Sequence, residues 1–370
     1  MNARLQDQLP KHGGQLRQIA SRFGIAAERL VDFSANINPA GPPPAVQSAI
    51  RSALEAQSIL ATYPDLDLVE LREAIAQYTG VQPENIAVAN GFVPLLEASL
   101  RSLRIQRCLL PVPCFGEYRR TLENAGVATV PLSLKQNQGF AYGIDTMREA
   151  LVNHSCDAIL LANPQNPSGV LCKGEEILCL MKFAAQRNIA VLLDEAFIDY
   201  CPLDSLTLRS TEFAKIVIFR SVTKFFAIPG LRVAYAVGKI STIKAMNCFV
   251  APWPITSFAS IAACAALRDE PYAEKSRTAN NRQRLWLEQE LVRLRIATYP
   301  SSTNFLLLRF PEAVDVNLLW ERMIVEEQVV MRSCTNFESL APMHLRIAVR
   351  SQDENERLVR GLERVLSGLL

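Results

Sequence analysis

The sequence predicts an α/β protein with a mostly parallel, seven-stranded sheet flanked by helices, together with a smaller α+β domain. Between residues 86 and 237, seven short apolar runs alternate with helical patterns, as in parallel sheets whose strands are connected by helices. After residue 257 this alternation stops and a long charged helical stretch follows. We therefore expect a large domain at 45–256, and a small domain formed by 1–44 and 257–370 with an N-terminal arm.

The expected strands of the large sheet are short, uncharged and often β-branched. They lie at 86–89, 108–112, 127–132, 158–162, 189–193, 216–219 and 233–237. Amphipathic stretches at 95–103, 146–153 and 175–187 are expected to be helices that cover this sheet. Ligands of such sheets bind beyond the carboxyl ends of the strands, so polar residues that directly follow a strand are candidates for a functional site.

The two ends of the chain are expected to supply the smaller domain. A short helix is expected at 16–23, a proline-rich crossing segment at 32–44 and a helix at 45–55, because Pro39 and the run 42–44 exclude helix and central strand. The C-terminal part has expected helices at 271–296 and 314–326 and expected strands at 303–310 and 345–349. Ser351 and Glu354 have the spacing of a capping box before a terminal helix.

The composition is that of an ordinary globular protein. The 370 residues are 49% hydrophobic and 21% charged, and the formal net charge of +2 gives no electrostatic reason to expect nucleic acid or an anionic membrane as partner. The nine cysteines are scattered and form no CxxC pair, which is typical of reduced thiols in a cytoplasmic protein. The polar N-terminus lacks the apolar region of a signal peptide, no apolar run reaches membrane-spanning length, and no metal site is expected.

One lysine, Lys224, follows the apolar run 216–219. A lysine at the end of a buried strand is costly unless it is paired or used chemically. Ser221 lies three residues before it and Arg232 eight residues after it, and a hydroxyl with a guanidinium group could hold a phosphate. A lysine beside a phosphate site suggests a Schiff base with pyridoxal phosphate. Taken alone, this stretch is better explained as a surface loop.

Two further strand ends carry polar side chains. Asp194 ends the run 189–193, where a carboxylate could bond a pyridinium nitrogen and keep it protonated, although a helix N-cap is the better explanation for this residue alone. Asn166 lies in the turn 163–169, which contains two Asn-Pro steps and a glycine. It could bond the phenolic oxygen of the cofactor, or the stretch could be only a tight turn.

Gly91 and Phe92 precede Pro94, a favourable residue at a helix start. Their amides would cradle a phosphate at the helix N-terminus, but many strand-to-helix turns have this pattern. Phe115 could stack on a flat ring or be a core residue. Tyr63 lies beside a proline, as in a surface turn, and Arg346 lies in the strand-like run 345–349, where it could grip a carboxylate or only extend to the surface.

Together, these residues resemble the fold-type I pyridoxal-phosphate enzymes of the class I/II aminotransferase group. The resemblance spans nearly the whole chain, and the turn 163–169, the sequence 194–196, the Ser-x-x-Lys at 221–224 and Arg232 occur in family order and spacing. The resemblance implies pyridoxal 5'-phosphate as cofactor, Lys224 as the Schiff-base lysine and Asp194 as the partner of the pyridinium nitrogen.

The resemblance also implies roles for the other candidates. Asn166 would bind the phenolic oxygen, Phe115 would stack on the ring, and Arg346 would bind the substrate carboxylate. The phosphate would be held by Gly91, Phe92, Ser221 and Arg232. Tyr63 would reach the phosphate of a neighbouring subunit, which implies a homodimer. The sequence departs from the family at Phe197, where a tyrosine usually bonds the phenolic oxygen.

Two branches of this family resemble the chain. Histidinol-phosphate aminotransferases match throughout, whereas 12–14 and 32–39 are more similar to the L-threonine-O-3-phosphate decarboxylases of cobalamin synthesis. Both act on small phosphorylated amines, so a second phosphate site is expected, for which the candidates are His12, Ser34, Asn36 and Arg332, with Asn166 also facing the substrate. We expect decarboxylation of threonine phosphate, with transamination as the alternative. A non-catalytic cofactor-binding regulator is less favoured, because the N-terminal segment is too short for a DNA-binding module and no basic patch is evident.

Overall fold

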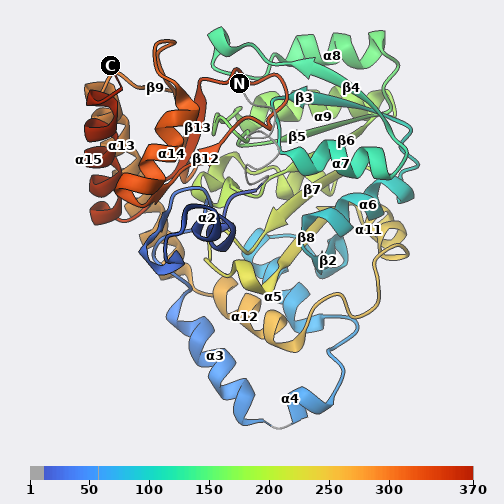
Figure 1. The fold of residues 1–370 in the computed structure, drawn as a ribbon. Helices are drawn as coiled ribbons and strands as arrows, with labels where there is room; N and C mark the ends of the chain where they lie inside the picture. Colours follow the sequence, from blue (N-terminus) through green and yellow to red (C-terminus); the bar gives the residue numbers. More distant parts are fainter. Residues whose placement is uncertain (1–11, 57, 370) are drawn as a thin grey trace.

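The computed structural model describes residues 12–56 and 58–369, and a seven-stranded sheet lies at its centre (Figure 1). The strand order is β2 (Ile86–Asn90), β8 (Val233–Gly238), β7 (Ile216–Ser221), β6 (Ala190–Asp194), β5 (Ala158–Ala162), β3 (Arg107–Val112) and β4 (Ala128–Ser133). β8 is antiparallel to both of its neighbours, and the other pairs are parallel. The expected mostly parallel sheet is confirmed, with one reversed strand.

Alternate side chains of the strands enter different apolar clusters, which explains why the strands are apolar throughout. On one face, Leu160, Leu192 and Phe219 pack with helices α6 (Phe92–Ser102), α7 (Gly116–Asn124) and α11 (Ile240–Asn247). On the other face, residues such as Leu161 and Leu193 pack with α8 (Ile144–Asn153) and α9 (Gly174–Gln186). A strand covered on both faces has no polar side, as expected for a buried parallel sheet.

Helix α12 (Ser257–Leu267) also packs on the large sheet. Its alanines share a cluster with α3 (Pro44–Glu55), with α5 (Val69–Thr79) and with Tyr235 of β8. The first helix after residue 257 thus packs with the larger sheet. The expected division of the chain into domains at that residue stays a prediction.

The smaller sheet is antiparallel, in the order β12 (Arg332–Ser333), β13 (His344–Ala348), β10 (Phe305–Arg309) and β9 (Ala297–Thr298). Helices α13 (Glu270–Arg293), α14 (Val316–Glu327) and α15 (Gln352–Ser367) pack around its apolar residues (Figure 1). The capping box before α15 is confirmed, because the Ser351 hydroxyl donates to Glu354 Oε2 at 2.7 Å and the Ser351 amide donates to the same oxygen.

The N-terminal residues pack with this C-terminal part. Helix α2 (Leu16–Phe23) lies beside it, and β1 (Val31–Asp32) pairs in parallel with β11 (Val329–Val330). Phe33 is fully buried in the same cluster, and its carbonyl accepts from the amide of Ala348 at 2.8 Å. The extended segment that follows reaches the large sheet, where the Asn38 amide donates to the carbonyl of Lys224 at 3.1 Å.

Short elements complete the described chain. They are the helices α4 (Ser58–Ala61) and α10 (Thr207–Ser210) and 3-10 turns at Ala27–Arg29, Pro83–Asn85, Gln136–Gln138, Ile198–Tyr200, Pro202–Asp204 and Pro229–Leu231. Among residues 12–56 and 58–369, no helix is both long and apolar enough to cross a bilayer.

Candidate active site

The predicted site residues gather at the carboxyl edge of the large sheet. Asp194 is the last residue of β6, and Ser221 is the last residue of the neighbouring β7, three residues before Lys224. The turn that contains Asn166 follows β5, on the other side of β6. Because these strands are parallel, their ends bring the three segments together.

Lys224 and Asp194 interact electrostatically within a buried environment. Burial lowers the pKa of the Lys224 amine below its ordinary value, and the charge of Asp194 partly offsets this effect. Burial raises the pKa of Asp194, while a hydrogen bond from Tyr118 and the charge of Lys224 act in the opposite direction. A lysine with a lowered pKa is a stronger nucleophile near neutral pH, because more of the amine is unprotonated.

Tyr118 holds the Asp194 carboxylate from the side of helix α7. Its hydroxyl donates to Asp194 Oδ2 at 2.5 Å, and the amide of Ala196 donates to Oδ1 at 2.9 Å. Tyr118 lies one helical turn after Phe115, and the two rings meet edge to face at 5.6 Å between centroids. Asp194 is therefore oriented by two donors and is not the N-cap of a helix, which was the alternative.

The reversed strand β8 brings the predicted phosphate residues together. Its first residue, Val233, pairs with Asn90 of β2, and Ala234 pairs with Ser221 of β7, so Arg232 lies between the ends of both strands. Gly91 has φ +92°, and a Cβ atom there would lie 2.8 Å from Arg232 Nη2. Only glycine allows both this backbone conformation and the close approach of the guanidinium group.

Helix α6 begins at Phe92, two residues earlier than Pro94, so its N-terminus directly follows Gly91, the residue that the Arg232 guanidinium group approaches. The Ser221 hydroxyl lies 2.7 Å from the hydroxyl of Thr223. Helix amides, hydroxyls and a guanidinium group are together the donors that a phosphate requires. These residues therefore fit the phosphate of pyridoxal phosphate.

Phe197 lies next to the Lys224 amine, with 5.2 Å between Nζ and the ring centroid. The ring is itself packed edge to face against Phe305 at 4.9 Å. A phenyl ring at this position offers the amine an apolar surface and no hydroxyl. The structure therefore places the departure from the family pattern beside Lys224, the predicted Schiff-base lysine.

Arg346 and Arg332 lie opposite each other on neighbouring strands, and both are buried. Arg346 Nη1 donates to Asn166 Oδ1 at 2.6 Å, and Nη2 donates to the carbonyl of Ser34 at 3.4 Å. Within the described residues, the buried Arg346 Nε has no hydrogen-bond partner. Burial, together with the charge of Arg332, lowers the pKa of Arg346 to about 10. Arg332 Nη2 donates to Asn336 Oδ1 at 2.7 Å.

The N-terminal candidates lie on the same side. His12 Nε2 is 3.2 Å from Glu117 Oε1, and its ring centroid is 6.3 Å from that of Phe115. The amide of Gly14 donates to the Ser34 hydroxyl at 2.9 Å, while a Cβ atom on Gly13 would collide with the Ser34 carbonyl. The close approach of this segment to Ser34 therefore requires glycine at position 13. Asn36 is buried, and its Oδ1 has no partner among the described residues.

Tyr63 contacts another part of the chain. Its side chain is 79% exposed, and its ring stacks on Trp253 with 4.7 Å between centroids.

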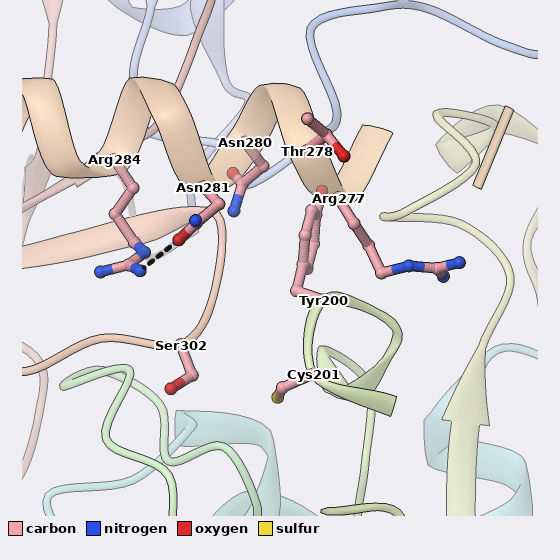
Figure 2. Close-up of a pocket in the computed structure, with 8 residues that line it drawn as sticks. All are labelled: Tyr200, Cys201, Arg277, Thr278, Asn280, Asn281, Arg284 and Ser302. Carbon is pink, nitrogen blue, oxygen red and sulfur yellow. Dashed lines mark hydrogen bonds between the residues drawn. The ribbon is translucent and has the colours of Figure 1, made fainter. Parts of the chain in front are cut away.

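Figure 2 shows a pocket with a volume of about 370 Å³. It lies between helix α13 and the turn at Tyr200, and its lining is Tyr200, Cys201, Arg277, Thr278, Asn280, Asn281, Arg284 and Ser302. The sequence had assigned no role to these positions.

Two residues of the site were not predicted. Tyr118 carried a detectable signal, because a residue three positions after Phe115 on a helix lies on the same face. Phe337 carried none, since its position depends on a loop between two strands. Its ring centroid lies 5.5 Å from Arg332 Cζ and 5.9 Å from Arg346 Cζ.

The sequence that forms this site matches a known protein family. The family described as aminotransferase class I and II matches residues 28–362. The chain belongs to this family. Its expected membership and fold are confirmed, and so is pyridoxal phosphate, the cofactor of aminotransferase class I and II enzymes.

Individual aminotransferase relatives resemble the chain over almost its whole length. It is 33% identical over 361 residues to the threonine-phosphate decarboxylase of Salmonella typhimurium, covering 97% of each chain. It is 28% identical to a histidinol-phosphate aminotransferase of Methanosarcina mazei, covering 95% of this chain and 92% of the relative. The structure of the histidinol-phosphate aminotransferase from Clostridium acetobutylicum superposes on this one with a TM-score of 0.85 at 27% identity. The match covers 92% of this chain and 100% of the other.

Proposed function

We propose that this enzyme decarboxylates L-threonine O-3-phosphate to (R)-1-amino-2-propanol O-2-phosphate, a reaction of cobalamin synthesis. The observation that carries the proposal is the pair of buried arginines, of which Arg346 also contacts Asn166. A substrate with a carboxylate at one end and a phosphate at the other offers one anion to each guanidinium group. The greater identity to a threonine-phosphate decarboxylase than to a histidinol-phosphate aminotransferase supports this choice.

We assign the cofactor to the residues that fit it. Lys224 would hold the aldehyde carbon, Asp194 the ring nitrogen, Phe115 one face of the ring and Asn166 the phenolic oxygen. Its phosphate would lie on Gly91, Phe92, Ser221 and Arg232. When bound, pyridoxal phosphate supplies an electron sink for the bonding pair left at the substrate Cα.

The protein residues would then control two proton positions and the pose of the substrate. Asp194 keeps a proton at the ring nitrogen, and the hydrogen bond from Tyr118 fixes the orientation of its carboxylate. Arg346 holds the carboxylate that leaves as CO₂, while Arg332, with His12, Ser34 and Asn36, holds the substrate phosphate. The Lys224 amine, which burial favours in its neutral form, would take up the proton that the substrate ammonium group releases on binding and deliver it to Cα after CO₂ has left.

We also propose a homodimer in which Tyr63 reaches the partner's cofactor phosphate. Leu60, Tyr63, Leu66 and Val69 are more than half exposed, which is unusual for so many large apolar residues in one short stretch. A mixed-subunit experiment tests this assignment. Tyr63→Ala and Lys224→Ala proteins should each be nearly inactive, and a refolded mixture should regain activity, because one site of each hybrid has both native residues. A mixture that stays inactive would contradict the assignment.

The cytoplasmic location remains part of the proposal. The nine cysteines are all free thiols, and five of them are buried. Burial raises the pKa of Cys114 to about 12 and that of Cys334 to about 11, so these thiols are poorly reactive.

Product analysis separates the two candidate reactions. Holoenzyme is incubated with threonine phosphate, and CO₂ and aminopropanol phosphate are quantified with and without 2-oxoglutarate. The proposal expects CO₂ in equal amount to the amine, independent of 2-oxoglutarate. If threonine phosphate is ignored and histidinol phosphate consumes 2-oxoglutarate, the enzyme is an aminotransferase.

A further inference from the structure

The loop 334–343 connects β12 to β13, and one of its side chains, Phe337, lies beside the two buried arginines. Phe337 is 6% exposed, and its ring lies against both guanidinium groups, at 5.5 Å from Arg332 Cζ and 5.9 Å from Arg346 Cζ. A cation against an aromatic face is attracted to it, especially where water is excluded. The loop therefore contributes a side chain to the place that the proposed function gives to the substrate anions.

Phe337 also packs between the parts of the chain that carry the four-stranded and the seven-stranded sheet. It belongs to a small apolar cluster with Tyr299 and Leu307 of the C-terminal part and with Phe140 from the connection between β4 and α8. Partly buried Leu134 and Val170 pack against the same cluster from the large sheet's side. The cluster is much smaller than the main apolar clusters, so separating its members exposes little apolar surface.

An ion pair ties the neighbouring residue to helix α7. Arg119 Nη2 lies 2.6 Å from Glu338 Oε2, and Arg119 Nε donates to the same oxygen at 2.7 Å. Arg119 follows Phe115 by one helical turn, so the pair links the loop to the helix that carries the proposed ring-stacking residue. The side chains are 32% and 41% exposed, and pairs as exposed as this are weak and sensitive to salt.

We propose that Phe337 is a movable wall of the substrate site and that the Arg119–Glu338 pair positions it. This inference rests on the proposed function, in which Arg332 and Arg346 bind the substrate. Both arginines are at most 7% exposed, so a substrate can reach them only after residues that cover them, among which we place Phe337, move away. Once the anions are bound, the returning ring excludes water from the charge contacts and thereby strengthens them. A weak ion pair suits this task, because it favours the closed loop without preventing its opening.

Glu338→Gln tests the positioning role. We expect hydrogen exchange of the amides in 334–341 to become about two- to fivefold faster, as loss of an exposed pair predicts, and the KM for threonine phosphate to rise with little change in kcat. The charge-swapped double variant Arg119→Glu/Glu338→Arg should restore both properties. Glu326→Gln is the matched control, because Glu326 pairs with Arg322 on α14 at 43% and 29% exposure, and it should leave exchange in the loop unchanged.

Phe337→Ala and Phe337→Leu test the wall itself. The alanine variant should have a higher KM and should lose the protection that threonine phosphate gives to amides 334–341. The leucine variant should have a smaller rise in KM and should keep part of that protection. Unchanged loop exchange and KM in Glu338→Gln and Phe337→Ala would overturn the inference. Failure of the proposed function is a separate result, in which wild-type holoenzyme releases no CO₂ from threonine phosphate while exchange still reports on the ion pair.

Discussion

Arg332 and Arg346 face each other across the antiparallel pair of β12 and β13, with both side chains buried. Burial lowers the pKa of each guanidinium group, and the charge of Arg332 adds to the effect on Arg346. Two like charges in opposite positions of a sheet destabilise it, and burying them adds a desolvation cost. An anionic ligand would offset both costs, which agrees with the proposed binding of the substrate anions by these two arginines.

Arg332→Ala should raise the KM for threonine phosphate by about tenfold or more, because a charge-assisted contact to phosphate is worth roughly 1.5–3 kcal/mol. Steady-state CO₂ release measures KM, and absorbance of the bound cofactor checks that its content is unchanged. Unphosphorylated threonine serves as the control substrate. It should be poor for the wild type and insensitive to the change, whereas an equal loss for both substrates would assign Arg332 a role other than phosphate binding.

Lys224→Ala should abolish covalent attachment of the cofactor. Borohydride treatment of wild-type protein should fix pyridoxal phosphate on the peptide that contains Lys224, as detected by mass spectrometry. Lys182→Ala provides a control lysine on helix α9 and should label like the wild type. Attachment that persists in Lys224→Ala would assign the reactive amine to a different residue.

Asp194→Asn should lower kcat more than about 10²-fold, because an amide cannot keep the ring nitrogen protonated. Tyr118→Phe should also lower kcat, but by less, since it removes one hydrogen bond that lowers the pKa of Asp194. The ¹⁵N resonance of labelled cofactor reports ring protonation directly and should move in both variants. Near-normal turnover in Asp194→Asn would mean that the carboxylate only supports the fold.

His344 should make the free energy of unfolding fall as the pH decreases below about 6.5. Burial lowers its pKa below the ordinary value of 6.5, so the unfolded chain takes up a proton at a higher pH than the folded protein does. The penalty is absent above the unfolded pKa and grows as the pH falls toward the folded pKa.

Urea unfolding at about pH 7.5 and pH 5.5 measures this dependence for the wild type and His344→Gln. Glutamine can still meet the Tyr299 hydroxyl, which lies 2.9 Å from His344 Nε2, but it does not titrate. The variant should lose less stability between the two pH values. An equal loss in both proteins would show that other groups cause the dependence.

The strand positions of the large sheet were predictable because each buried strand is a short apolar run between helical patterns. The direction of β8 was not predictable, because its side chains are buried whether the strand runs parallel or antiparallel to its neighbours. Helix α12 was missed for a related reason. Residues 257–267 are nearly all apolar or small, so the sequence has no amphipathic period, as expected for a helix in contact with core on several sides.

The site was predictable where it depends on strand ends, since Asp194, Ser221 and Lys224 are placed by the sheet alone. The contact of Asn166 with Arg346 joins residues 180 positions apart and depends on how the seven-stranded and four-stranded sheets meet. Phe337 reaches the arginines through a loop whose conformation no local pattern specifies. Tertiary contacts of this kind can be identified only from the folded structure, because the spacing of motifs along the sequence does not determine them.

The parallel pairing of β1 with β11 has a consequence for synthesis on the ribosome. Val31 cannot pair with Val329 until Val329 has left the ribosome. The Ser34 carbonyl likewise cannot accept its hydrogen bond from Arg346, 312 residues later, until Arg346 has been made. The large sheet, whose pairs lie closer in the sequence, can form while the chain is still growing. The N-terminal segment, although made first, therefore docks among the last, and a chain released before Arg346 would leave it without its partner.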